Sequence, residues 1–105
     1  MTYSVEQPQA FAHWHDSLRD MRDMRDMRAR IAIARRIERT AAGNLGDVGS
    51  LGEGLRELRI DVAAGYRVYF IQRGEVIIVL LAGGDKSSQR RDIHTARQLA
   101  HEVRT

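Results

Sequence analysis

The sequence predicts an α+β fold: a short N-terminal strand, a helical hairpin, a three-stranded antiparallel meander and a C-terminal helix. Two observations about periodicity support this class. Apolar residues recur at intervals of three and four towards both ends of the chain, whereas apolar and polar residues alternate in the segment between residues 55 and 73. A chain of 105 residues suffices for one two-layer core but not for a second. We therefore expect a single domain over residues 1–105.

The N-terminal segment is expected to form a strand and then a helix. Residues 2–6 form the short strand, and Pro8 suits the first position of a helix, where its missing N–H is not needed. His13 and His15 point in nearly opposite directions on this helix, so they cannot bind one metal ion and are expected to be solvated. Its apolar stripe consists of Phe11, Trp14, Leu18 and Met21.

An internal repeat follows, with the triplet Arg-Asp-Met occurring three times in residues 19–27 before Arg28. Its opposite charges at i,i+4 (Arg19 with Asp23, Arg22 with Asp26) favour extension of a helix. Methionines at this spacing are typical of packing. We assign the repeat no catalytic role.

A second helix is predicted to run to about Ala42, with an apolar stripe of Ile31, Ala34, Ile37 and Ala41. Gly43 lies where a left-handed residue ends a helix. Residues 43–54 contain five glycines and are expected to form a loop. This loop lacks the GxxxxGK[ST] order of a phosphate loop, and Glu53 would repel a phosphate.

Two strands with alternating polarity are predicted between residues 55 and 71. Leu58, Ile60 and Val62 face one way in the first, and Tyr66, Val68 and Phe70 do so in the second. A hairpin loop of residues 63–65 would pair Val62 with Tyr66. That register places Asp61 opposite Arg67 and Arg59 opposite Tyr69 on one exposed face.

The third strand of the meander is predicted at residues 76–82, which are apolar throughout as in a central strand, after a turn at Arg73 and Gly74. Lys86 is expected in the loop that follows, a common place for binding groups. The C-terminal helix has an apolar stripe of Ile93, Ala96, Leu99 and Ala100.

Composition limits the classes of function. The chain has no cysteine, which excludes disulfides and thiolate chemistry, and residues 1–10 do not have the pattern of a signal peptide, so a cytoplasmic protein is expected. Residues 76–82 are the longest apolar run, too short to span a membrane. The net charge is +3, and 16 of the 17 basic residues are arginine because Lys86 is the only lysine. Either selection for phosphate binding or GC-rich codon usage would account for that bias.

Four blocks in this order, GNLGD, ELRI, GYRVYF and GGDKSSQ, together with an earlier F-x-x-W, resemble the phage-derived, HigB-like branch of the RelE/ParE toxin superfamily. The resemblance spans nearly the whole chain, and the Arg-Asp-Met repeat departs from it. It implies a β-α-α-β-β-β-α fold and a toxin neutralised by a helix-turn-helix, HigA-like antitoxin. Many members of the superfamily cleave mRNA on the ribosome without a metal or other cofactor. The matching positions are Arg59 in ELRI, Arg67 in GYR and Lys86 in GGDK.

The implied reaction is attack of a ribose 2′-OH on the adjacent phosphorus. Arg59 and Arg67 would stabilise the charge that develops on the phosphoryl oxygens, and Lys86 would hold phosphate or protonate the leaving oxygen. The candidates for the general base are Tyr69, Glu57 and His94. The residues predicted to contact RNA are Arg56, Arg73, Gln89, Arg90 and Arg91. Operator DNA would be bound only through the antitoxin complex.

Two alternatives remain open from the sequence. A ParE-like protein of the same fold would inhibit DNA gyrase by binding, without chemistry of its own, and fold does not separate it from a nuclease. A nucleic-acid-binding module would keep the basic face and lack toxicity.

Overall fold

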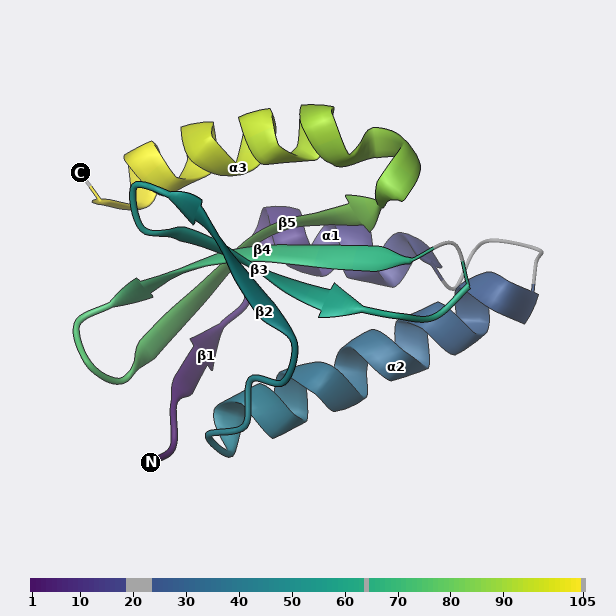
Figure 1. Ribbon diagram of the computed structural model, residues 1–105, viewed down its shortest axis with the longest axis horizontal. Coiled ribbons are helices and arrows are strands. Elements are labelled where there is room, and N and C mark those ends of the chain that lie inside the picture. The colour runs from purple at the N-terminus through teal and green to yellow at the C-terminus, as the bar shows by residue number, and fades with distance from the viewer. Residues whose placement is uncertain (19–23, 64, 105) are drawn as a thin grey trace.

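A mixed sheet with helices on both faces forms the molecule (Figure 1), in an α+β arrangement as the sequence predicts. The computed structural model describes residues 1–18, 24–63 and 65–104, without the side chains of residues 24–26. Within these ranges the elements are β1 (Ser4–Glu6), α1 (Gln9–Ser17), α2 (Met24–Ala41), β2 (Val48–Gly52), β3 (Leu55–Ile60), β4 (Tyr66–Arg73), β5 (Ile77–Asp85), the 3-10 turn η2 (Lys86–Ser88) and α3 (Gln89–Arg104).

The predicted meander is confirmed and forms the centre of the sheet, whose strand order is β1-β5-β4-β3-β2. The N-terminal strand β1 pairs in parallel with β5. Strand β2 pairs antiparallel with β3, although its residues were predicted to form a loop. Gly49 explains the error, because a Cβ atom there would lie 2.1 Å from Nη2 of Arg59. Glycine within a strand permits this close approach. It also weakens the sequence pattern by which a strand is predicted.

Two apolar clusters lie on opposite faces of the sheet. Helices α1 and α2 cover one face through Phe11, Leu18, Ile33 and their neighbours, which pack on Val68 and other strand residues. Helix α3 covers the other face (Figure 1). Its cluster contains Leu55, Tyr69, Ile71, Val79, Leu81, Ala96 and Ala100. The face that the sequence predicts to be exposed is therefore partly buried.

The helical hairpin differs in detail from its prediction. In α2 the buried positions include Ala29 and Ile33, whereas Ile31 is 45% exposed, so the predicted stripe is rotated. Gly43 has a φ of +102°, as a left-handed residue after a helix should. His15 is not simply solvated, because its Nε2 atom lies 3.0 Å from the carbonyl oxygen of Arg30.

Met21, the last residue of the predicted stripe in the first helix, lies outside the described residues. The predicted charge pairs of the Arg-Asp-Met repeat do so as well. Among the helices that the structure describes, none is long and apolar enough to cross a membrane.

The register between β3 and β4 is shifted by two residues from the predicted one. Arg59 pairs with Arg67, and Glu57 pairs with Tyr69. The chain between these strands is longer than the predicted loop, because β3 ends at Ile60 and β4 begins at Tyr66. Asp61 consequently lies beyond the pairing and is not opposite Arg67.

Strand β5 continues three residues beyond its predicted end, through Asp85, and the buried residues on both of its faces confirm its central position. Glycine at positions 83 and 84 permits the strand to continue between the helices. A Cβ atom at Gly83 would overlap Trp14 of α1, and a Cβ atom at Gly84 would overlap Asp92 of α3. Lys86 accordingly lies in η2 and not in an irregular loop.

Candidate functional site

Arg59 and Arg67 form the centre of the candidate site as direct cross-strand partners in β3 and β4. Facing side chains in such a pair have Cβ atoms about 5 Å apart, within reach of one phosphate group. The side chain of Arg59 is 40% exposed and that of Arg67 is 15% exposed. Like charges at this distance repel, so the arrangement requires a nearby anion.

Glu57 supplies negative charge from within the protein. Its Oε1 atom lies 3.1 Å from Nε of Arg59 and 4.0 Å from Nε of Arg67, and its side chain is only 5% exposed. A buried carboxylate is stable only if it is paired, so Glu57 and the two arginines depend on one another.

Asp47 provides a second carboxylate, on the outer side of Arg59. Its Oδ1 atom accepts a hydrogen bond from Nη1 of Arg59 at 3.2 Å, and its side chain is 66% exposed. Hydrogen bonds to Glu57 and then to Asp47 raise the pKa of Arg59 above its ordinary value. Arg59 is therefore a fixed positive charge near neutral pH.

Arg36, on α2, holds the main chain of this region. Its guanidinium donates to the carbonyl oxygens of Leu45 at 2.7 Å, Asp47 at 2.6 Å and Arg59 at 2.8 Å. It is only 8% exposed, and its burial lowers its pKa. A Cβ atom at Gly46 would lie 2.9 Å from this guanidinium, so glycine is needed beside it. Helix α2 thus fixes the backbone on both sides of the pair formed by Arg59 and Asp47.

Tyr69 pairs with Glu57 across β3 and β4 and is fully buried. Burial, followed by the nearby carboxylates of Glu57 and Asp92, raises its pKa well above the ordinary value. Among the residues that the structure describes, its hydroxyl has no hydrogen-bond partner, and neither have Oε2 of Glu57 and Nε of Arg67. Tyr69 is therefore a neutral phenol near pH 7 and cannot act as a base.

Lys86 approaches from the end of β5. Its main-chain N–H donates to the carbonyl oxygen of Gly65 at 3.1 Å, and its side chain crosses that glycine, where an added Cβ atom would lie 2.7 Å from Cε. Gly65 precedes Arg67 by two residues. The structure thus brings the lysine to the same end of β4 as Arg67.

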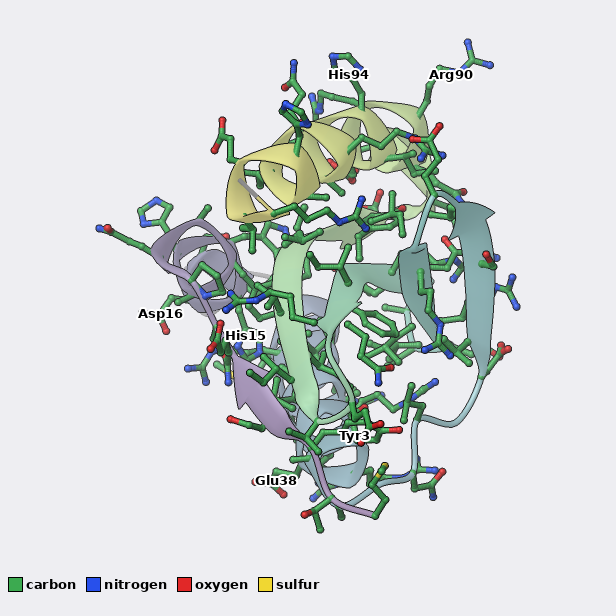
Figure 2. The ribbon with its side chains drawn as sticks, turned by 90° about the vertical axis from the view of Figure 1, so that its left-hand side faces the viewer. Tyr3, His15, Asp16, Glu38, Arg90 and His94 are labelled. Carbon is green, nitrogen blue, oxygen red and sulfur yellow. The ribbon has the colours of Figure 1, made fainter. Side chains whose placement is uncertain are left out.

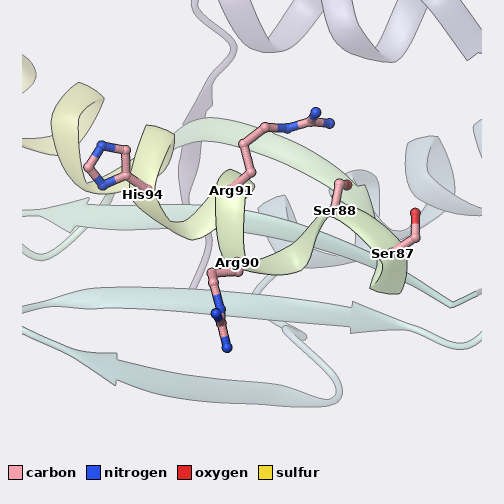
Figure 3. A pocket seen from close by; sticks show the side chains of 5 residues that line it. All are labelled: Ser87, Ser88, Arg90, Arg91 and His94. Atoms are coloured by element: carbon pink, nitrogen blue, oxygen red, sulfur yellow. The ribbon is translucent and has the colours of Figure 1, made fainter.

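Helix α3 carries two of the predicted residues, Arg90 and His94, on its outer side, away from the sheet (Figure 2). With Ser87, Ser88 and Arg91 they line a shallow hollow at the start of the helix, in which Arg90 and Arg91 point in different directions (Figure 3). His94 is thus not placed beside Arg59 and Arg67.

The remaining predicted RNA contacts are dispersed. Arg56 lies 5.3 Å from the ring centre of Phe70, on the face that α1 and α2 cover. Arg73, at the far end of β4, lies 3.5 Å from Glu6. Gln89 is the first residue of α3. Among the residues that the structure describes, no three His, Asp or Glu side chains converge to hold a metal ion.

A protein of Haemophilus influenzae (strain ATCC 51907 / DSM 11121 / KW20 / Rd), described as an uncharacterized protein, is 40% identical to this chain over 103 residues, which is 98% of either chain. The chain belongs to the family of this Haemophilus protein. Because the match is nearly end to end, it extends across every strand and helix of the candidate site. No protein-family model matches the chain, and no solved structure matches it.

The sequence reasoning missed three residues of the site, namely Arg36, Asp47 and Asp92. Arg36 could have been found from the helical period, since it follows buried Ile33 by three positions. Asp47 lay in the segment predicted as a loop. Asp92 lies over Gly84 and accepts a hydrogen bond from the hydroxyl of Ser88.

Proposed function

We propose that this chain has a RelE/ParE-like fold and is the toxin of a type II toxin-antitoxin pair, acting in the cytoplasm as a metal-independent endoribonuclease on ribosome-bound mRNA. The cross-strand pair of Arg59 and Arg67 carries the proposal. Two guanidinium groups on rigid strands are fixed donors for the charge that grows on a phosphoryl group during 2′-OH attack. Lys86, at the same end of β4, is a third positive group for the phosphate or the leaving oxygen.

The positions of the three candidate bases favour one of them. Tyr69 is neutral and buried, and His94 lies on the outer side of α3. Glu57 is the remaining candidate base, and it contacts both arginines. Substrate would have to approach past the partly exposed Arg59 to reach its carboxylate.

One observation favours the alternative, a ParE-like inhibitor of DNA gyrase. Glu57 and Asp47 already neutralise the two arginines, as in a purely structural ion-pair network. A protein that only binds gyrase needs no free phosphate-binding group. The cognate antitoxin, of the helix-turn-helix class, would neutralise the toxin in either case.

Induction of the chain in cells separates the two functions. RNA ends are mapped together with plasmid supercoiling, for the wild type, Arg67→Ala and the matched variant Arg35→Ala, which removes an exposed arginine of α2. Cuts within mRNA that disappear only with Arg67→Ala support the nuclease. Intact mRNA combined with gyrase-linked DNA damage would refute it.

A further inference from the structure

The guanidinium of Arg59 is shared between two carboxylates of different character. Its Nε atom contacts Glu57, and its Nη1 atom contacts Asp47. The Glu57 side chain is 5% exposed and that of Asp47 is 66% exposed. Removing Glu57 from the arginines would leave a buried charge without a partner, whereas Asp47 can rotate into water. Asp47 is therefore the carboxylate that an incoming anion displaces.

Carboxylate and phosphate oxygens accept hydrogen bonds from a guanidinium in the same geometry. The four groups Arg59, Arg67, Glu57 and Asp47 sum to zero charge, so a phosphate gains little attraction while Asp47 remains in place. Release of Asp47 leaves a net positive site for the phosphate.

The backbone is arranged to permit this exchange. Arg36 donates to the carbonyl oxygens of both Asp47 and Arg59, which fixes the two residues side by side. The Arg59 N–H also donates to the Asp47 carbonyl oxygen at 2.9 Å. Only the side chain of Asp47 has to move.

We propose that Asp47 occupies the position on Arg59 that a substrate phosphate takes, and so sets the affinity of the site for RNA. The inference rests on the proposed function, because it assumes that Arg59 binds the phosphate of an RNA substrate. Asp47 is a specificity-determining residue in this account: weakly bound anions do not displace it, whereas a polyanion held by further contacts does.

The test measures binding of a short single-stranded RNA with 2′-O-methyl riboses, which lacks the nucleophile and is not cleaved. Asp47→Asn is expected to bind about 2- to 5-fold more tightly than the wild type, the range expected when one weak competing ion pair is removed. Its log–log salt dependence should steepen by up to about 0.7, one counterion on a single strand. Asp47→Glu keeps the competing carboxylate and is expected to return to wild-type affinity.

Asp61→Asn is the matched control, since it removes the same charge from an exposed residue two positions after Arg59. Equal tightening by Asp47→Asn and Asp61→Asn would overturn the inference, because net charge alone would then account for both. Loss of binding with Arg59→Ala and Arg67→Ala in that same experiment would leave the proposed site intact. If those two variants bind as the wild type does, the proposed function fails together with the inference. Thermal unfolding of each variant confirms that it is folded.

Discussion

The guanidinium of Arg36 donates a hydrogen bond to the main-chain carbonyl oxygen of Arg59 at 2.8 Å. A helix on one side of the sheet thereby holds the strand whose side chains form the candidate site on the other side. The same guanidinium also holds the carbonyl oxygens of Leu45 and Asp47. Stability and site geometry consequently depend on one buried arginine.

Arg36→Lys should lower the free energy of unfolding by about 2–4 kcal/mol, because lysine cannot satisfy three carbonyl oxygens at these positions and each buried acceptor left unpaired is destabilising. Urea unfolding measures this change. Arg35→Lys, at the neighbouring exposed position, is the control and should change stability by less than about 0.5 kcal/mol. Equal stability of the two variants would show that the carbonyl contacts of Arg36 contribute nothing.

Gly49→Ala should weaken RNA binding while leaving the stability of the fold nearly unchanged. An added Cβ atom would lie 2.1 Å from Nη2 of Arg59, the far end of a flexible side chain, so the guanidinium moves and the strand remains. We expect RNA binding to weaken about 10-fold, as for loss of one phosphate contact. The unfolding free energy should change by less than about 1 kcal/mol.

Parallel titrations of RNA binding and urea unfolding check this prediction. Ser50→Ala, at the next and exposed position of β2, should leave both quantities unchanged. A variant Gly49→Ala with wild-type RNA binding would show that the position of Arg59 is unimportant for binding.

The raised pKa of Tyr69 should make the stability of the protein depend on pH in the alkaline range. Its pKa is raised in the folded state, so the folded state retains the phenolic proton after the unfolded chain has lost it. Its contribution to stability is fully present below pH 10 or so, the pKa of a free tyrosine, and falls by at most about 1.4 kcal/mol per pH unit above it. Tyr69→Phe should flatten this decline, with a change of less than about 1 kcal/mol at pH 7, since the hydroxyl has no hydrogen-bond partner in the part of the chain that the structure describes.

Urea unfolding between pH 7 and pH 11 measures this slope. Tyr3→Phe, on the N-terminal segment, is the control and should keep the wild-type decline. If Tyr69→Phe declines as steeply as the wild type, burial of the phenol does not control the alkaline transition.

The elements that local signals define were predicted well. The period of the apolar residues identified the helices and the three strands of the meander, and Gly43 marked the end of α2 through its left-handed φ. These features depend on residues close together in the chain. Local sequence therefore carried the order of the helices and of the meander strands, and placed Arg59 and Arg67 on one face of the sheet.

The errors arose where distant residues decide the structure. Strand β2 was missed because Gly49 makes room for the Arg59 side chain, which no local pattern reveals. The register of β3 and β4 depends on a loop whose hydrogen bonds, from Val62 N–H to Ile60 and from Gly65 N–H to Val62, set its length. Tyr69 was predicted to be exposed, but helix α3 packs over it. That helix comes from a remote part of the chain, which the alternation of residues within the strand does not reveal.

We propose that Arg59 and Arg67 stabilise a phosphoryl group during RNA cleavage. The most direct measurement incubates purified protein with programmed ribosomes and analyses the ends of the mRNA products. We expect 2′,3′-cyclic phosphate and 5′-OH ends, with a cleavage rate reduced about 100-fold or more in Arg67→Ala and unchanged in Arg35→Ala, at an exposed position of α2. Cleavage by Arg67→Ala at the wild-type rate, or no cleavage by the wild-type protein, would contradict it.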